Sequence, residues 1–411
     1  MTASGLWRRP GFGRFWTAST VSELGTPITT LAVQVLVVVD LQSSAAALGV
    51  VNAARWVPYL LFGLVVGVLV DRAARRLPLL IACDLVRAAL LGVVPLLYLL
   101  GALNVPAVVA MAALIGLVSV VRDAGHQSVL PRLVPAQLLT VANARLEQAG
   151  AVGRTSGPLL AGALVRVLGA PLTLLVAAAT FLVSGILVAT VRRVEHGRTD
   201  RSSAPRHLGH ELAEGLRWVY RHTVLAPMAV WVHIWFLFNA MLTTVFVPYA
   251  LRDLDLGALG LGVSYAASGV GAVLGGAAAG RAARRLGLGW AVVAAHWLTP
   301  LAFGLVLVTP PGPVAWVLVG VAQLLFGLFV GLSSPLELGF RQAVTPDRLQ
   351  GRMNATIRSL NWGMIAIGAP VGGLLADHFG ARVALGIGIA GVALASVGLM
   401  LSPFRRARAA G

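Results

Sequence analysis

The phrase GVLVDRAARR at Gly67–Arg76 returns 209 positions later as GAAAGRAARR at Gly276–Arg285, with Gly280 in the place of Asp71. Self-similarity over such a distance indicates a duplicated structural unit. More matches occur at an offset of 211, where Pro135 pairs with Pro346, Asn143 with Asn354, Gly157 with Gly368 and Gly169 with Gly380. The chain therefore contains two copies of one plan.

Composition excludes an ordinary soluble protein. Of the 411 residues, 58% are hydrophobic and 11% are charged, and the mean hydropathy is +0.85. A soluble domain has about 25% charged residues. Runs of about 20 apolar residues, long enough to span a hydrocarbon core roughly 30 Å thick, occur twelve times, near 15–38, 46–69, 78–100, 104–121, 141–165, 171–191, 224–250, 257–279, 287–308, 314–337, 353–376 and 382–402.

These runs predict an all-α integral membrane protein with twelve transmembrane helices in two parallel six-helix repeats, because an even number of helices returns the chain to the same side. The first half is residues 1–195 and the second half is residues 223–411. The linker between them, residues 196–222, begins polar and ends in an amphipathic pattern typical of a helix on the membrane surface. The linker is a simple tether or, alternatively, a regulatory or partner-binding segment.

The basic residues predict the orientation. All 32 are arginine, and 25 of them fall in cytoplasmic segments if the amino terminus is cytoplasmic, against Arg166, Arg252 and Arg382 in outer loops. This asymmetry follows the positive-inside rule, so both termini are expected in the cytoplasm. The formal charge of +17 therefore reflects topology and not nucleic-acid binding. We expect a monomer in the lipid bilayer of a bacterial inner membrane.

The phrase Gly67-x-Leu69-x-Asp71-Arg72-x-x-Arg75-Arg76 resembles the loop 2–3 signature of the major facilitator superfamily (MFS), with Ala74 in the place of a glycine. The resemblance covers nearly the whole chain. It implies a gating contact between Asp71 and the start of helix 11, because a carboxylate stabilises a helix amino terminus. For Arg75 we expect Asp123 as the partner. Alternatively, the arginines act only as topological anchors. The expected gating residues are Gly67, Asp71, Arg72, Arg75, Arg76 and Asp123.

A second motif lies in helix 5. Gly153, Gly157, Pro158 and Gly162 resemble the helix 5 signature of the exporter branch, and the segment 128–144 resembles the bacterial drug- and siderophore-exporter subgroup. Small residues let a neighbouring backbone approach, and Pro158 removes a hydrogen-bond donor. Plain helix packing is the alternative to a specific role in preventing leak through the cavity.

Ionisable residues inside a membrane are costly and point to function. Glu23 in helix 1 and Arg55 in helix 2 both lie near the membrane centre, so we expect them to carry proton coupling, with a static structural pair as the alternative. Asp84 and Arg87 lie three apart on helix 3 and are expected to pair with each other. Glu147 and Arg358, at equivalent repeat positions, are candidates for a gate or for plain interfacial charges.

Several polar and aromatic residues are candidates for a substrate cavity. Each one alone is also typical of a satisfied helix contact. Together they supply polar groups and aromatic surfaces, as a small-molecule site requires. The expected cavity residues are Arg154, His233, Trp235, Asn239, Gln323, Asn361 and Trp362.

No enzyme motif fits its required context. GIGIAG at 386–391 matches a dinucleotide pattern but lies inside an expected helix with no preceding strand. We therefore expect no enzyme, no cofactor and no metal. The preferred function is proton-driven efflux, by antiport, of small amphipathic molecules such as antibiotics, siderophores or secondary metabolites, which would confer antibiotic resistance. The alternatives are an uptake permease, a lipid flippase or a non-transporting membrane sensor or scaffold.

Overall fold

The computed structural model describes residues 4–7, 11–72, 76–191 and 208–407, and within these ranges it contains helices and loops but no strand. The first half consists of α1 (Ser4–Trp7), α2 (Phe12–Val35), η1 (Leu36–Asp40), α3 (Ala45–Arg72), α4 (Leu77–Leu99), α5 (Val105–Leu133), η2 (Ala136–Leu138), α6 (Leu139–Leu168) and α7 (Ala170–Val191). α8 (Leu208–Arg221) follows. The second half consists of α9 (Leu225–Pro248), η4 (Tyr249–Asp253), α10 (Gly257–Leu286), α11 (Leu288–His296), α12 (Leu298–Val308), α13 (Pro313–Val344), α14 (Asp347–Phe379), α15 (Ala381–Leu401) and η5 (Pro403–Arg406).

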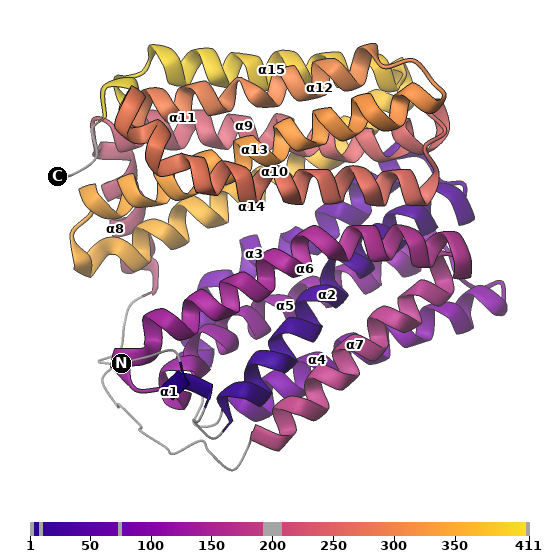
Figure 1. Ribbon diagram of the computed structural model, residues 1–411, viewed down its shortest axis with the longest axis horizontal. Coiled ribbons are helices and arrows are strands. Elements are labelled where there is room, and N and C mark those ends of the chain that lie inside the picture. The colour runs from indigo at the N-terminus through magenta and orange to yellow at the C-terminus, as the bar shows by residue number, and fades with distance from the viewer. Residues whose placement is uncertain (1–3, 8–10, 73–75, 192–207, 408–411) are drawn as a thin grey trace.

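The two halves form two helix bundles that meet at one end and diverge at the other (Figure 1). α1 and α8 lie at the diverging end, on the left of the view, which we call the α8 end. The opposite end, where the halves converge, is called the far end. Both halves repeat the same local feature, because α2 and α9 each finish in a π-helical turn, η1 and η4. The expected duplication is therefore visible in the structure.

The helices confirm the expected membrane fold. Eleven helical segments in the described part of the chain are long and apolar enough to cross a membrane. α6 has the length, with 30 residues, but its apolar character is reduced by Arg145, Glu147, Arg154 and Arg166. α6 nevertheless packs between α2 and α10, so it completes the six-helix half. The expected run at 287–308 divides into α11 and α12 around Trp297.

Small residues let the halves approach closely at two helix crossings. α3 crosses α14, where a Cβ on Gly49 would collide with the backbone of Ala369 and a Cβ on Gly373 with that of Ala45. α6 crosses α10, where Gly162 and Gly262 stand in the same relation to each other's helix. Backbones can approach this closely only where the side chain is absent. The crossings therefore join the halves toward the far end.

Polar contacts strengthen the junction at the far end. The two carboxylate oxygens of Asp377, near the end of α14, accept hydrogen bonds from the backbone N–H groups of Ala45 (2.9 Å) and Ala46 (3.0 Å) at the start of α3. A helix amino terminus has free N–H groups and a positive partial charge, so a carboxylate stabilises it. Arg252 Nη2 donates to the carbonyls of Val38 (2.7 Å) and Ser43 (2.8 Å). Each of these contacts links one half to the other.

Candidate functional site

A cavity of about 710 Å³ lies between the halves. α6 forms its wall on the first half, and α9, α10 and α13 form it on the second. Most of the lining surface is apolar. Its polar groups come from Glu147, Arg154, Thr155, Thr243, Tyr265, Ser268, Gln323 and Ser334. The α6–α10 crossing lies on its far-end side, because Pro158 lines the cavity and its carbonyl lies against Gly262. A drug-sized ligand needs about 300–1,000 Å³ and a mainly apolar wall with few polar groups, so the cavity suits one.

Two of the seven expected cavity residues, Arg154 and Gln323, line this cavity. Arg154 Nη2 lies 3.7 Å from Glu147 Oε2, with side-chain exposures of 61% and 80%. Such an exposed pair contributes little stability, about 0–1 kcal/mol. Glu147 does not pair with Arg358, whose guanidinium lies over the ring of Trp362 at 4.8 Å.

The other expected cavity residues lie elsewhere. His233 Nδ1 bonds to Asn361 Oδ1 at 2.6 Å, and the Tyr220 hydroxyl lies 2.8 Å from His233 Nε2. Trp235 is buried in the second half and its indole donates weakly to Thr299 at 3.4 Å. The Oδ1 atom of Asn239 is buried without a partner among the described residues. The hydrogen bonds of His233, Asn361 and Trp235 therefore lie within the second half. The sequence prediction failed here because helix periodicity alone does not distinguish a face packed inside one half from a face that lines the cavity.

Trp362 belongs to an aromatic contact between the halves. Its ring centroid lies 4.4 Å from that of Tyr59 and 5.7 Å from that of Trp56, both on α3. The Tyr59 hydroxyl donates to Asp123 Oδ2 at 2.8 Å. Asp123 was expected to bind Arg75, which lies outside the described residues. The aromatic contact extends the α3–α14 junction from the far end toward the middle of the bundle.

The remaining gating residues can be placed only in part. Gly67, Asp71 and Arg72 lie in the part of α3 whose side chains fall outside the described residues. Arg76 directly precedes α4 and makes an interaction of its own. The expected latch between Asp71 and the start of α14 stays a prediction.

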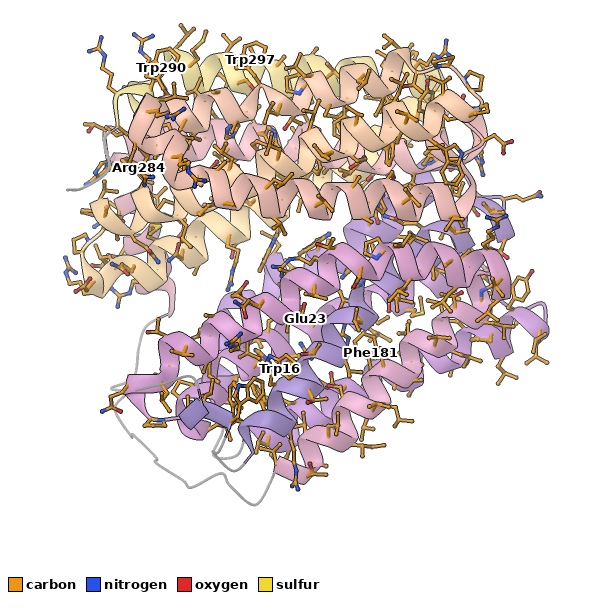
Figure 2. The ribbon with its side chains drawn as sticks, in the orientation of Figure 1. Trp16, Glu23, Phe181, Arg284, Trp290 and Trp297 are labelled. Atoms are coloured by element: carbon orange, nitrogen blue, oxygen red, sulfur yellow. The ribbon has the colours of Figure 1, made fainter. Side chains whose placement is uncertain are left out.

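Glu23 lies near the middle of α2 (Figure 2) and is partly exposed. Within the described part of the chain its carboxylate makes no hydrogen bond or ion pair, so the static pair with Arg55, which was the alternative to proton coupling, does not form. Arg55 Nη1 donates to Thr30 Oγ1 at 2.6 Å instead. Thr30 lies seven residues beyond Glu23 on the same helix, so Arg55 reaches α2 two turns closer to the far end.

The expected pair of Asp84 and Arg87 is also wrong. Asp84 Oδ1 accepts from Arg122 Nε at 2.9 Å, and Asp84 Oδ2 accepts from Ser184 Oγ at 2.7 Å. Arg122 Nη2 donates to Ser22 Oγ at 2.8 Å. Arg87 turns to α2 and donates to Thr26 Oγ1 at 3.1 Å. We call Asp84, Arg122, Ser22 and Ser184 the buried network. Arg122 was missed because its sequence neighbours gave no sign of a partner 38 positions away.

The helix 5 motif packs on both sides of α6. A Cβ on Gly153 would press against the backbone of Glu23, and one on Gly157 would collide with Pro27, both on α2. Gly162 serves the α10 crossing on the other side. The motif therefore gives α6 room between α2 and α10, as the packing alternative predicted. Its role in preventing leak stays a prediction.

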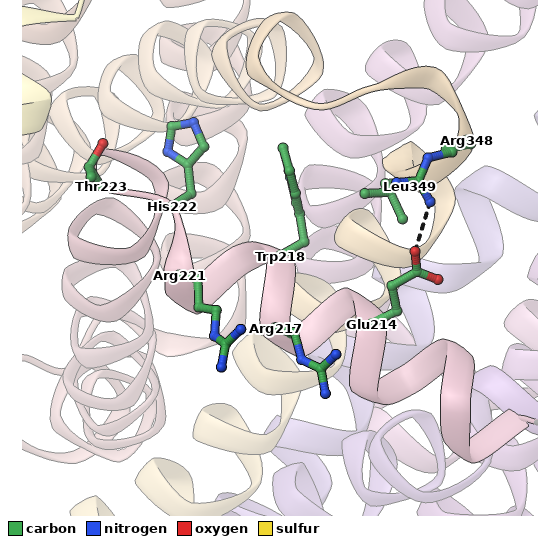
Figure 3. A pocket seen from close by; sticks show the side chains of 8 residues that line it. All are labelled: Glu214, Arg217, Trp218, Arg221, His222, Thr223, Arg348 and Leu349. Atoms are coloured by element: carbon green, nitrogen blue, oxygen red, sulfur yellow. Dashed lines mark hydrogen bonds and ion pairs between the residues drawn. The ribbon is translucent and has the colours of Figure 1, made fainter.

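A second cavity of about 570 Å³ lies at the α8 end, between α8 and the start of α14 (Figure 3). Glu214 on α8 binds Arg348 at 2.8 Å and also Arg352. Trp218 Nε1 donates to Thr345 Oγ1 at 3.2 Å. Burial raises the pKa of Tyr220 above its usual range. The helix expected in the linker is thus anchored to α14.

Comparison with known proteins identifies the family. The family model described as transmembrane secretion effector, an MFS family, matches residues 3–410. The multidrug efflux pump Tap of Mycolicibacterium fortuitum is 27% identical over 370 residues, covering 88% of each chain. An MFS-type transporter of Sinorhizobium fredii is 27% identical over 408 residues, covering 97% of this chain and 96% of that protein.

Solved structures share the fold. The nucleoside transporter NupG superposes with a TM-score of 0.77 at 12% identity, over 95% of this chain and 98% of that chain. A bacterial homologue of the iron transporter ferroportin in its inward-facing state gives a TM-score of 0.76 at 15% identity, over 99% of this chain and 100% of that one. With two six-helix halves, a cavity between them and a family match over almost its full length, the chain belongs to the transmembrane secretion effector family of MFS membrane transporters.

Proposed function

We propose that this transporter is a proton-driven exporter, an antiporter that moves small amphipathic molecules such as antibiotics, siderophores or secondary metabolites out of a bacterial cell. The observation that carries the proposal is the cavity of about 710 Å³ between the halves, with its mainly apolar wall and few polar groups. Such a wall accepts molecules by shape and hydrophobicity more than by a fixed set of hydrogen bonds. The relatives named Tap are described as multidrug efflux pumps, which supports the same substrate class.

The proposed orientation puts the α8 end in the cytoplasm. The arginine distribution supports it, because 25 of the 32 basic residues then fall in cytoplasmic segments. In this orientation the halves diverge toward the cytoplasm and their contacts through Asp377 and Arg252 close the outer side. An exporter loads its substrate from the cytoplasm in such a conformation.

Glu23 is the proposed proton carrier. Its carboxylate lies in the middle of a membrane-spanning helix, is partly exposed, and makes no hydrogen bond or ion pair in the described part of the chain, although Arg122 attracts it through space. Asp84, in contrast, is engaged in a direct ion pair with Arg122. An ionisable side chain at this depth of a membrane is a functional candidate.

The test is transport by proteoliposomes that contain the purified full chain, with an imposed pH gradient and a panel of labelled amphipathic compounds. We expect compounds to accumulate against their gradient, and a protonophore to abolish the accumulation. Accumulation that is unaffected by the protonophore would exclude proton coupling. Movement of fluorescent phospholipids between leaflets, with no transport of the panel, would favour a lipid flippase.

The orientation has its own test. In Cys83→Ser protein, a cysteine placed at Ser202 should react with an impermeant maleimide only from the cytoplasmic side, and one placed at Pro311 only from outside. Labelling at position 202 from outside would contradict the proposed topology.

A further inference from the structure

A small cavity lies inside the first half, separate from the large cavity between the halves. Its volume is about 40 Å³, and α2, α3, α4 and α5 form its wall. A cavity needs about 10–15 Å³ to hold one water molecule. This one therefore has room for a small ion or for a single end group of a larger molecule, but not for a drug-sized molecule.

Two arginine side chains line this cavity. Arg87 is 4% exposed, and its Nε atom is buried without a partner among the described residues. Arg87 Nη2 donates a hydrogen bond to the hydroxyl of Thr26. The guanidinium carbon lies 3.8 Å from the centroid of the Phe181 ring. Arg55, from the neighbouring helix, donates to the hydroxyl of Thr30. Both guanidiniums thus keep donor groups for something inside the cavity.

No carboxylate bonds directly to either of these arginines in the described part of the chain. The cavity lining contains none, and in the described part of the chain neither Arg55 nor Arg87 forms an ion pair. The nearby carboxylates act on the two arginines only through space, Asp123 on both and Asp84 on Arg87. Their own hydrogen bonds go elsewhere, since Asp84 binds Arg122 and Asp123 accepts from the Tyr59 hydroxyl. Charged groups buried in a membrane protein are expected to be paired, because an uncompensated charge is costly in an apolar medium. Two adjacent arginines without a directly bonded carboxylate thus leave guanidinium donors available for an anion in the cavity.

Neutral polar groups complete the wall. Three threonines of α2, together with Gln34 and Asn52, face the cavity beside five apolar side chains. Gln34 is also 3.5 Å from the hydroxyl of Tyr265, which lines the large cavity. Asn52 Nδ2 donates to Thr244 of the second half at 3.2 Å. The small cavity is therefore directly connected with the interface between the halves.

We propose that this cavity is a binding site for a small monovalent anion, held between Arg55 and Arg87. The anion is a halide ion or the carboxylate group of a larger molecule, since both have one negative charge and a size that matches the cavity. Charge-assisted hydrogen bonds from guanidinium groups are the strong ones in proteins, and the apolar surroundings exclude competing water. The site goes beyond the proposed export function and does not depend on it.

The experiment is isothermal titration of the purified full chain in detergent, in a buffer whose only anion is the bulky HEPES sulfonate. Sodium chloride and sodium acetate are titrated separately, and acetamide serves as the neutral analogue of acetate with nearly the same shape. We expect saturable binding of one anion per chain for chloride or acetate, and none for acetamide. This comparison uses the unmodified protein, so it does not depend on the folding of any variant.

Arginine variants test whether the anion binds in this cavity. Arg55→Gln and Arg87→Gln are each expected to lower the anion affinity at least tenfold, because one charge-assisted contact is lost. Arg382→Gln is the matched control, since it removes an exposed arginine at the start of α15. It should leave the affinity unchanged.

The outcomes separate the two sources of the anion. Binding of chloride without acetate identifies a free inorganic ion, whereas mutual competition identifies a site that also accepts the carboxylate of a larger molecule. The proposal is overturned if neither anion binds saturably, if acetamide binds as tightly as acetate, or if both arginine variants keep full affinity. Because the assay measures binding in detergent, a negative result leaves the export proposal intact, and a failure of transport leaves this one intact.

Discussion

Asp84 is the acceptor at the centre of the buried network, with a side chain that is 1% exposed. We predict that Asp84→Ala lowers stability by about 3–5 kcal/mol, because Arg122 then keeps a buried charge without its carboxylate. Thermal unfolding in one detergent measures this. Asp84→Ala combined with Arg122→Met removes both charges and should recover part of the loss. If the single variant unfolds at the same temperature as the unmodified protein, the ion pair contributes nothing to stability.

Glu23 differs from Asp84 because its carboxylate makes no hydrogen bond or ion pair in the described part of the chain. We predict that Glu23→Gln abolishes accumulation driven by a pH gradient while downhill exchange of substrate remains, since the glutamine carries no titratable proton. Transport by proteoliposomes with and without the gradient measures the two activities. The control is Asp255→Asn, an exposed acidic residue whose positive φ of 50° suits asparagine. If Glu23→Gln still concentrates substrate with the same pH dependence, Glu23 is structural.

Among the helices, α8 is held by a few contacts at one end of the bundle. Its polar face depends on Glu214, which binds Arg348 and Arg352, while Val219 is fully buried beneath it. We predict that Glu214→Gln lowers the protection of α8 amides against hydrogen exchange by roughly fivefold, because a partly exposed pair contributes about 1 kcal/mol. Glu147→Gln, which breaks the exposed pair on α6, should leave α8 unchanged. Equal protection in both variants would mean that apolar packing and the Trp218 hydrogen bond anchor the helix without Glu214.

α3 and α14 form the longest contact between the halves, and different interactions hold it at different depths. At the far end Asp377 caps α3, and in the middle Tyr59 and Trp56 pack on Trp362. The capping contact exists only while the halves converge at the far end, because its donors and acceptor come from different halves. Asp377 occupies the position that Arg166 holds in the first repeat. The duplicated unit therefore supplies this capping carboxylate on one side only.

For the whole molecule, we predict that Asp377→Ala shifts the equilibrium toward a conformation that is open at the far end. Loss of a helix cap costs about 0.5–2 kcal/mol, which corresponds to a change of roughly 2- to 30-fold in the ratio of the two conformations. The reporter is a cysteine that replaces Thr244, a residue that is 1% exposed, in Cys83→Ser protein. With Asp377→Ala this cysteine should react faster with a maleimide added on the side of the membrane that the far end faces than it does in protein that keeps Asp377. Asp253→Ala at the same end is the control. An unchanged labelling rate would show that the glycine crossings alone keep this end closed.

The hydropathy and the internal repeats of the sequence were sufficient to predict the architecture of the molecule. The apolar runs predicted the existence of the long helices, and the repeated phrases predicted two parallel halves, both of which the structure confirms. Several helices extend beyond the expected apolar run, as α5 does by 12 residues at its end, Leu133. The physical reason is that each property is local to one segment: a membrane span is recognised by the length and apolarity of a single run. α6 shows the limit, since its four charged residues reduce its apolarity although it packs as a full member of the first half.

The hydrogen-bond and ion-pair partners of the polar residues could not be predicted from the sequence. Sequence spacing suggested Asp84 with Arg87, but Asp84 binds Arg122 from another helix, and Arg55 binds Thr30 and not Glu23. Asp377 reaches a helix start more than 330 positions away. Spacing along one helix shows which residues share a face, whereas an ion pair or a cavity depends on how neighbouring helices are rotated and shifted against each other. That arrangement follows from the packing of glycines such as Gly49 and Gly162 against a facing backbone, which exists only in the folded molecule.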